Sequence, residues 1–351
     1  MKRWLKITLW AVGAVLAVLA LVVGFLSLPI GDPDLSSHPN PATSYNAAIV
    51  RIEARKAREA KEPLQPVTGS IAMVHGSRTT TSVVIFHGYT HSPYQWRVVA
   101  KAYYDAGYNV WVPLAPSHGY ADRMTDALSQ LTPAGLRAYA DEGVDIGRGL
   151  GKNVEVVGLS TGGDAAVWTA VERPDVAKTI AIAPVMDPKG VPSWMLLPVA
   201  RWYRYMPDNF NWWQPAQKET MPGPAYPRFS FRGVFASIQL SEWALAKARA
   251  AGAPPVKGLY GIVANYADKS VDTTYAVQGA ELITPKDRLT VFRIPAALGF
   301  GHDLIEPDGE NKLIIAEVYP VVARILGIPL PDPHAPGAGD DATTTPTIGL
   351  P

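Results

Sequence analysis

The chain has 351 residues, a formal net charge of +1 from 32 basic and 31 acidic side chains, and no cysteine. This length suffices for one large α/β domain with appendages, and the charge balance gives no reason to expect a nucleic-acid partner. The lack of cysteine excludes disulfides, thiol catalysis and cysteine-ligated metal sites.

The N-terminal segment predicts a membrane anchor. Residues 1–6 are basic, and the run from Ile7 to Leu28 is uncharged and almost wholly apolar. About 20 such residues span a bilayer, whereas the apolar core of a cleaved signal peptide usually has about 7–15 and ends in a small-x-small site. Phe25-Leu26-Ser27 puts a bulky residue at that place. We expect a single-pass helix at 7–28 with residues 1–6 in the cytoplasm and the remainder extracytoplasmic; a secreted protein after signal cleavage is the second choice.

Residues 29–66 are predicted to form a linker and a helix. Gly31 to Pro41 is rich in Pro, Ser and Asp, and Ser44 to Lys61 has a helical repeat of small apolar residues at Ala47, Val50, Ala54 and Ala57. The basic side chains of this helix are candidates for contact with anionic lipid. Interleaved Glu53 and Glu59 favour instead a solvated face with pairs four residues apart.

Residues 67–330 alternate between strand and helix patterns. Apolar strand patterns occur at 70–74, 82–86, 108–113, 154–157, 179–183, 257–265 and 289–294. Helical segments lie between them, and a last helix is expected at 311–326. This alternation predicts an α/β fold with a doubly wound, mostly parallel sheet. The Pro/Gly/Thr-rich tail at 331–351 is predicted to be disordered.

The alternation breaks between about residues 186 and 256. This segment holds five tryptophans and repeated prolines, so it is not a further strand–helix unit. We predict an inserted, aromatic-rich cap. Its aromatic side chains either line an apolar pocket or form the core of the cap itself.

The pentapeptide Gly158-Leu159-Ser160-Thr161-Gly162 lies between a predicted strand and a predicted helix. This is the context of a nucleophile elbow, in which a serine sits on a tight turn at the end of a sheet. A side chain at Gly158 or Gly162 would collide with neighbouring backbone, which explains glycine there. The following helix directs N–H groups at a developing oxyanion.

A serine hydroxyl needs a base and an orienting carboxylate to become a nucleophile. Asp268 and His302 follow later predicted strands, in the order that this type of elbow requires. Asp272 competes with Asp268, although it also suits the cap of a following helix. The other histidines lie in the linker, in the tail or before Ser160. His87 and His91 lack a third ligand, so no metal and no cofactor are expected.

Together, His87-Gly88, the Ser160 elbow, the Asp268 loop and Gly301-His302 resemble the α/β-hydrolase superfamily. The resemblance is greatest to its capped carboxylesterase, monoacylglycerol lipase and lysophospholipase-like group, and it covers about residues 67–328. It implies that Ser160 is the nucleophile, His302 the base and Asp268, not Asp272, the acid. It also implies that the backbone N–H groups of Tyr89 and Thr161 form the oxyanion hole.

One departure from the family pattern concerns the loop after the 108–113 strand. It reads Ser117-His118-Gly119 where many members have Gly-His-Gly. We expect a membrane-anchored serine hydrolase acting on carboxylic esters, with lipid-like or other apolar acyl groups. A serine aminopeptidase or an acyltransferase on the same fold is the alternative. A non-catalytic envelope binding module is disfavoured because the set of catalytic roles is complete.

Overall fold

A seven-stranded sheet forms the centre of the computed structural model, which describes residues 3–28, 31–213 and 223–334. The strand order is β1-β3-β2-β4-β5-β8-β9; β1 runs antiparallel to β3, and the other neighbours are parallel. This confirms the predicted mostly parallel sheet. The strands are β1 (Ile71–Met73), β2 (Thr79–Phe86), β3 (Asn109–Val112), β4 (Gly151–Leu159), β5 (Lys178–Ile182), β8 (Leu259–Asn265) and β9 (Leu289–Ile294).

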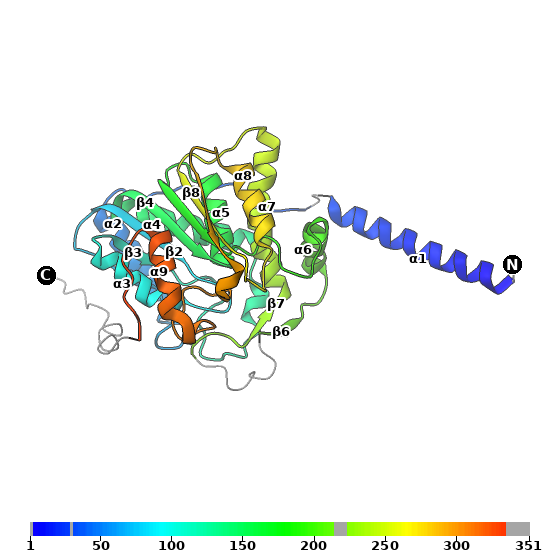
Figure 1. The fold of residues 1–351 in the computed structure, drawn as a ribbon, viewed down its shortest axis with the longest axis horizontal. Coiled ribbons are helices and arrows are strands. Elements are labelled where there is room, and N and C mark those ends of the chain that lie inside the picture. The colour runs from blue at the N-terminus through cyan, green and yellow to red at the C-terminus, as the bar shows by residue number, and fades with distance from the viewer. Residues whose placement is uncertain (1–2, 29–30, 214–222, 335–351) are drawn as a thin grey trace.

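Helices cover both faces of this sheet (Figure 1). The central strands β2 and β4 are therefore mostly buried and rich in valine, as expected for parallel strands. The register pairs Phe86 with Gly158 and Asn265 with Ile294, so the carboxyl ends of these strands share one edge. Besides α1 (Arg3–Ser27), the α-helices outside the insertion are α2 (Tyr45–Glu59), α3 (Arg97–Asp105), α4 (Pro133–Leu150), α5 (Thr161–Glu172), α8 (Thr273–Ile283) and α9 (Ile315–Leu326).

Helix α2 forms where predicted, and packing against the domain selects the face that is buried. Ala48 and Ile52 are fully buried, whereas Val50 is 68% exposed. The buried face includes Ala48, Ile49 and Ile52, and it packs against α4, where Gly149 leaves room for Ala48. Small residues at helical spacing therefore did not decide which face is buried.

Two basic residues of α2, Arg55 and Arg58, form ion pairs within the domain. Arg55 forms an ion pair with Glu59, at 3.1 Å, and another with Glu142 of α4. Arg58 also reaches Glu142, at 3.3 Å. The pair of Arg55 and Glu59 agrees with the alternative of pairs four residues apart, whereas Glu142 is a partner that the sequence analysis did not name.

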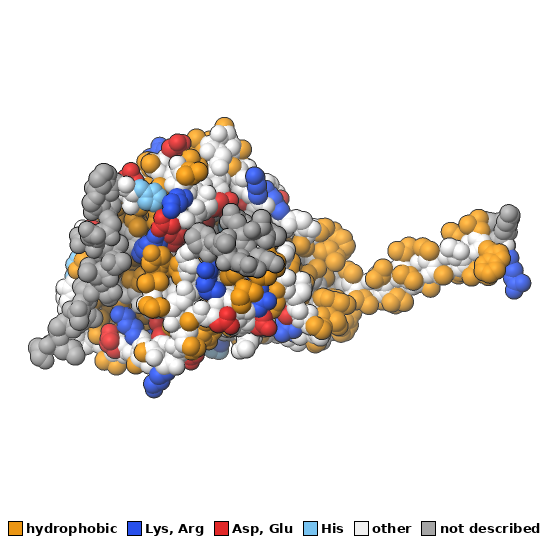
Figure 2. Space-filling view, turned by 90° about the horizontal axis from the view of Figure 1, so that it is seen from below, with side chains coloured by type: hydrophobic (Ala, Val, Ile, Leu, Met, Phe, Trp, Pro, Cys, Tyr) orange, Lys and Arg blue, Asp and Glu red, His pale blue; other side chains and the backbone are white. Residues whose placement is uncertain are grey.

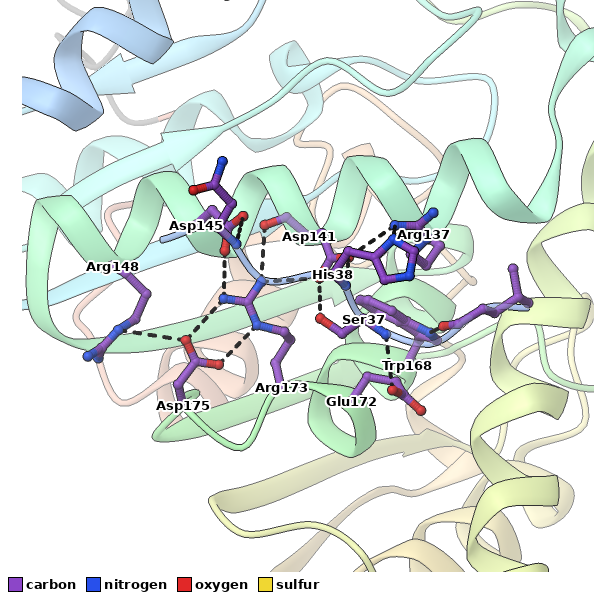
Figure 3. Close-up of polar contacts among 12 residues, drawn as sticks. Ser37, His38, Arg137, Asp141, Asp145, Arg148, Trp168, Glu172, Arg173 and Asp175 are labelled. Carbon is purple, nitrogen blue, oxygen red and sulfur yellow. Dashed lines mark hydrogen bonds and ion pairs between the residues drawn. The ribbon is translucent and has the colours of Figure 1, made fainter. Parts of the chain in front are cut away.

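Residues 31–42, which include the predicted linker from Gly31 to Pro41, are bound against α4 and α5 (Figure 3); we call this segment the strap. Asp141 accepts hydrogen bonds from Ser37 Oγ, at 2.5 Å, and from the His38 N–H, at 2.8 Å. Asp145 accepts one from the Asn40 N–H at 2.8 Å. These bonds to charged acceptors hold the strap at the surface of the domain.

A buried arginine joins those carboxylates to the end of α5. The guanidinium of Arg173, which is 1% exposed, lies 3.2 Å from Asp141 and 2.8 Å from Asp145. Its Nε lies 3.0 Å from Asp175 (Figure 3). Nearby, Trp168 Nε1 donates to the carbonyl of Leu35 at 2.8 Å. The strap is thus part of a charged network that also fixes α4 against α5.

The insertion, residues 186–256, lies between β5 and β8. Its long helix packs along α5, and a shorter helix packs on that one. Tyr203 stacks on Phe235, with ring centroids 5.3 Å apart, and Trp213 packs on Phe229. These aromatic side chains contribute to the packing of the insertion itself. Its elements are the 3₁₀ turn η3 (Ser193–Met195), α6 (Leu196–Tyr205), the antiparallel strands β6 (Phe210–Trp212) and β7 (Arg228–Ser230), and α7 (Phe231–Ala251).

Helix α1 (Arg3–Ser27) extends away from the domain (Figure 1). Among the described residues, it is the one helix long and apolar enough to cross a membrane. A signal sequence has the same features, so the choice between anchor and signal stays a prediction. The predicted disorder of the tail falls largely on residues 335–351, which lie outside the described residues.

Candidate active site

Ser160 occupies a sharp turn between β4 and α5. Its φ of 60° and ψ of −120° are rarely adopted by a non-glycine residue, and such conformations cost about 1–3 kcal/mol. A Cβ on Gly158 would overlap the carbonyl of Gly162, and one on Gly162 would overlap the carbonyl of Phe86. The predicted steric reason for these two glycines is confirmed.

The side chains of Ser160, His302 and Asp268 lie in one hydrogen-bonded line. Ser160 Oγ is 3.0 Å from His302 Nε2, and His302 Nδ1 is 2.7 Å from Asp268 Oδ2. A proton on Nδ1, facing the carboxylate, leaves Nε2 as the acceptor for the serine hydroxyl. The three residues follow β4, β8 and β9, and meet because those strands end at the same edge of the sheet.

Burial and pairing act in opposite directions on the two titratable groups. Burial alone would lower the pKa of His302, but the hydrogen bond and charge of Asp268 raise it above 6.5. Burial would raise the pKa of Asp268, yet His302 and the N–H groups of Ser270 and Val271 bring it below its ordinary value. The pair therefore favours an ionised carboxylate beside an imidazole that readily takes a proton.

Asp272 has a different environment. Its carboxylate caps α8, accepting from the N–H of Thr274 at 2.7 Å and of Tyr275 at 3.2 Å. The prediction that Asp272 caps a helix is confirmed. Of the two candidate acids, the geometry brings Asp268 to His302.

Thr161 is the first residue of α5, so its N–H has no acceptor within the helix. Tyr89 lies on the loop after β2. The ring of His87 supports this loop through two hydrogen bonds. The ring of His87 donates from Nδ1 to the Gly88 carbonyl and accepts at Nε2 from the Ala115 N–H, both at 2.9 Å. Burial lowers the pKa of His87 well below its usual value, which keeps the ring neutral for these two roles.

Residues of the insertion also hold the loop of Tyr89 in place. Tyr89 Oη donates to the Ser230 carbonyl at 2.9 Å, and a Cβ on Gly233 would overlap that hydroxyl. The next residue, Thr90, accepts at its carbonyl from the Tyr226 N–H and at Oγ1 from Trp213 Nε1, both at 2.9 Å. The position of Tyr89 therefore depends on the insertion.

The unusual loop at Ser117-His118-Gly119 packs beside the same residues. His118 is buried, donates from Nδ1 to the Pro116 carbonyl at 2.7 Å, and stacks near Tyr226. Burial lowers its pKa to about 4, so the ring is neutral. Ser117 takes a positive φ of 65°, a conformation that a glycine at this position would adopt more readily.

Two buried asparagines position His302, and the sequence did not single them out as site residues. Asn265 Nδ2 donates to the carbonyls of Phe300 and Gly301, at 2.9 and 3.0 Å. Asn311 accepts from the Gly301 N–H and donates to the Asp303 carbonyl, both at 2.8 Å. The backbone on both sides of His302 is thus held by side-chain amides. The sequence shows Asn265 only as the polar residue that ends the apolar run at 257–265.

Gln95 connects the loop of Tyr89 to the loop of His302. Its Oε1 accepts from the Gly88 N–H at 2.8 Å, and its Nε2 donates to Asp303 at 2.7 Å. Gln95 is 2% exposed. Nothing local in the sequence marks it, because both of its partners are brought to it by the fold.

Within 3–28, 31–213 and 223–334, no group of three or more His, Asp or Glu side chains is arranged to hold a metal ion. His87 and His91 bind separate partners, since His91 Nε2 lies 3.5 Å from Asp303. The expectation of no metal and no cofactor stays a prediction.

Comparison with known proteins identifies the family to which the chain belongs. The model of the alpha/beta hydrolase family matches residues 83–317, more than half of the chain. The chain is 27% identical over 132 residues to the thermostable monoacylglycerol lipase of Bacillus sp. (strain H-257). That match covers 37% of this chain and 51% of the relative, so the chain spans about half the length of the curated relative it matches.

Two solved structures share the fold at low sequence identity. One, from work on LipS and LipT, two metagenome-derived lipolytic enzymes, has a TM-score of 0.52 and 20% identity, and covers 75% of this chain and 99% of its own. The other is a soluble variant of monoglyceride lipase from Saccharomyces cerevisiae in complex with a substrate analog, with a TM-score of 0.53, 13% identity and coverages of 74% and 91%. The sheet, the elbow and the family match together give one conclusion: the chain belongs to the alpha/beta hydrolase family.

Proposed function

We propose that this protein is a membrane-anchored serine hydrolase that cleaves carboxylic esters with lipid-like or other apolar acyl groups. The observation that carries the proposal is the hydrogen-bonded line from Ser160 through His302 to Asp268, at 3.0 and 2.7 Å, on an alpha/beta hydrolase fold. The similarity to a monoacylglycerol lipase supports an ester as the substrate.

In the proposed mechanism, Ser160 Oγ attacks the acyl carbonyl while His302 Nε2 takes the serine proton. Asp268 holds the imidazole in the productive tautomer and stabilises the imidazolium that forms. The backbone N–H groups of Tyr89 and Thr161 stabilise the oxyanion of the tetrahedral intermediate. His302 then protonates the leaving alcohol as the carbon–oxygen bond breaks, which leaves an acyl group on Ser160.

Deacylation reverses these roles with water as the nucleophile. His302 removes a proton from water as it attacks the acyl-enzyme, and returns a proton to Ser160 Oγ as the acid leaves. His302 must be neutral at the start of both steps. The hydrogen bond from Nδ1 to Asp268 supports this cycle because it makes Nε2 a better acceptor.

The proposed organisation follows from the apolar N-terminal helix. Residues 1–6 lie in the cytoplasm, residues 7–28 cross the membrane, residues 29–66 precede the domain, and residues 67–330 form the hydrolase with an inserted cap at about 186–256. The basic residues before the helix support this orientation. The hydrolase then acts outside the cytoplasm, next to the outer leaflet.

Activity-based labelling tests the proposal directly. The full chain in detergent is incubated with a fluorophosphonate probe and then with p-nitrophenyl esters of increasing acyl length. We expect Ser160→Ala to lose labelling and at least a thousandfold in turnover. Ser129→Ala, at a half-buried serine of the Ala127–Gln130 turn, should behave as the parent. A Ser160→Ala variant that kept a tenth of the activity would exclude Ser160 as nucleophile, and an aminoacyl p-nitroanilide preferred over every ester would favour an aminopeptidase.

A further inference from the structure

The end of α1 packs against α6 of the insertion (Figure 1). Between them lies an open groove of about 430 Å³ lined by apolar residues, which we call the α1–α6 groove. Figure 2 shows hydrophobic side chains gathered where the helix meets the domain. The groove is lined by Val18, Val22 and Phe25 of α1 together with Trp202, Tyr205 and Met206 beside or within α6.

A polar clamp fixes α6 to the end of α1. Asp32 pairs with Arg201, at 2.6 Å, and with Arg204, at 2.8 Å. Arg201 also donates to the carbonyl of Leu26 at 2.8 Å, one of the last carbonyls of α1 that have no partner within the helix. Arg204 donates to the Gly31 carbonyl at 2.7 Å. A guanidinium at a helix C-terminus is also favoured by the helix dipole.

The position of these contacts along α1 sets how deep α6 would reach in a bilayer. Val18 lies nine residues before the last residue of α1, or about 13 Å at about 1.5 Å per residue. A hydrocarbon core needs about 20 helical residues, and α1 has 25. Val18 would therefore lie within the core when α1 crosses the membrane, and the aromatic side chains that line the groove with it would lie in the outer leaflet.

The solvent exposure of Trp202 and Tyr205 agrees with a position in the outer leaflet. Trp202 and Tyr205 are 43% and 60% exposed, whereas Arg201 on the same helix is buried in its contact with Asp32. Trp and Tyr are the residues enriched at membrane–water interfaces. Asp32 pairs with both Arg201 and Arg204, so its one negative charge offsets one of their two positive charges.

We propose that α6 is a second membrane contact, seated in the outer leaflet beside α1, with phospholipid acyl chains in the α1–α6 groove. The inference rests on the proposed anchor. It means that the insertion is fixed relative to the bilayer. The insertion also holds Tyr89, whose hydroxyl donates to the Ser230 carbonyl. The ion pairs of Asp32 therefore connect the membrane helix, through the insertion, to the proposed oxyanion loop.

The absence of cysteine from the chain makes a site-specific test direct. Tyr205→Cys and Met206→Cys are each labelled with a nitroxide in the full chain, reconstituted in phosphatidylcholine vesicles. Power saturation then compares collisions with oxygen, which concentrates in lipid, against a water-soluble nickel chelate. The matched control is Leu313→Cys, a hydrophobic position that is 97% exposed on the domain. Val15→Cys reports on α1 itself.

We expect the labels at 205 and 206 to behave like the label at 15, with oxygen collisions dominant, and the label at 313 to favour nickel. Labels at both 205 and 206 that favour nickel while the label at 15 favours oxygen would overturn the inference. A nickel-accessible label at 15 would show that α1 does not cross the membrane, and the inference would fail with the anchor on which it rests. Spin–spin broadening at 205 that disappears on dilution with unlabelled protein would show a second copy of the chain, not lipid, on this surface.

The same preparations separate this inference from the proposed chemistry. Each labelled protein is also assayed for ester hydrolysis, and Tyr205→Cys is repeated in a Ser160→Ala background. If the inference is correct, the Tyr205→Cys protein with Ser160→Ala loses hydrolysis, while its label at 205 keeps the same balance of oxygen and nickel collisions. Absence of hydrolysis in every variant, with oxygen-dominated labels at 205 and 206, would contradict the proposed function alone.

Discussion

Asp268 Oδ2 lies 2.7 Å from His302 Nδ1, although the two residues are 34 positions apart in the chain. The other oxygen of Asp268 accepts the N–H of Ser270 at 2.7 Å. Asp272, four residues later, instead holds two N–H groups at the start of α8. Two carboxylates on one loop thus have different partners, and they should have different functions.

Substitution of these two residues should have opposite consequences. Asp268→Asn should lower turnover by up to about ten-thousandfold with little loss of stability, because an amide favours the wrong tautomer of His302. Asp272→Ala should keep most turnover and lose about 1 kcal/mol of unfolding free energy, since it removes a helix cap. Turnover and melting temperature of both variants decide the matter. An inactive Asp272→Ala beside an active Asp268→Asn would make Asp272 the acid.

Activity should depend on pH through the protonation of His302. Its pKa is raised above 6.5 by the hydrogen bond and charge of Asp268, against the opposing effect of burial. The protonated ring cannot accept the Ser160 proton, so kcat/KM should fall as pH drops through this raised pKa. The midpoint of the acid limb should therefore lie above 6.5. A limb that stays flat down to about pH 5 would contradict the role of His302 as base.

Features that depend on a few adjacent residues were predictable from the sequence. The elbow at Ser160 needs a strand, a tight turn and a helix in direct succession, and all three have strong local signals. The same holds for the helix N-cap at Asp272, because this residue directly precedes α8. The parallel sheet followed from the alternation of strands and helices, and it brings Asp268 and His302 near Ser160 because parallel strands end at one edge.

Features that depend on distant partners were not predictable in this way. The strap at residues 31–42 has the composition of a linker, and its acceptors Asp141 and Asp145 lie more than 100 positions away. Asn265 looks like an ordinary strand end until the fold brings Gly301 to it. The buried face of α2 also depends on a distant partner, since it is the face that contacts α4.

Asn265 should act as a positioning residue for His302. Asn265→Ala removes the donors to the Phe300 and Gly301 carbonyls, so the histidine loop loses part of its support. We expect kcat to fall by roughly 10- to 100-fold with KM nearly unchanged, because a small misplacement of a catalytic group is costly. The acid limb should also move to lower pH, since a looser pair with Asp268 raises the pKa of His302 less.

The control for this variant is Asn153→Ala, at an exposed position near the start of β4. It should match the parent in kcat, KM and pH profile. If Asn265→Ala lost stability, but kept the parent kcat and the parent acid limb, the amide would be a packing element without influence on His302.

The strap should contribute to the stability of the domain, which can be measured with two soluble variants that lack α1. One begins at Gly31 and keeps the strap, and the other begins at Ser44 and removes it. Loss of the strap leaves Asp141 and Asp145 without the donors Ser37, His38 and Asn40. Because hydrogen bonds to charged groups contribute about 1.5–3 kcal/mol each, the shorter variant should lose at least about 2 kcal/mol.

Trp168→Phe provides the matched control for that comparison, because its indole N–H donates to Leu35 of the strap. In the variant that begins at Gly31, the substitution should lose about 1 kcal/mol for the hydrogen bond, in addition to the cost of a smaller ring at this fully buried position. In the variant that begins at Ser44, the partner is already gone, so the cost should be smaller by the contribution of that hydrogen bond. Urea unfolding of the four proteins gives both differences. Equal stability of the two parent variants would show that residues 31–43 only connect the anchor to the domain, and that the contacts to Asp141 and Asp145 do not stabilise it.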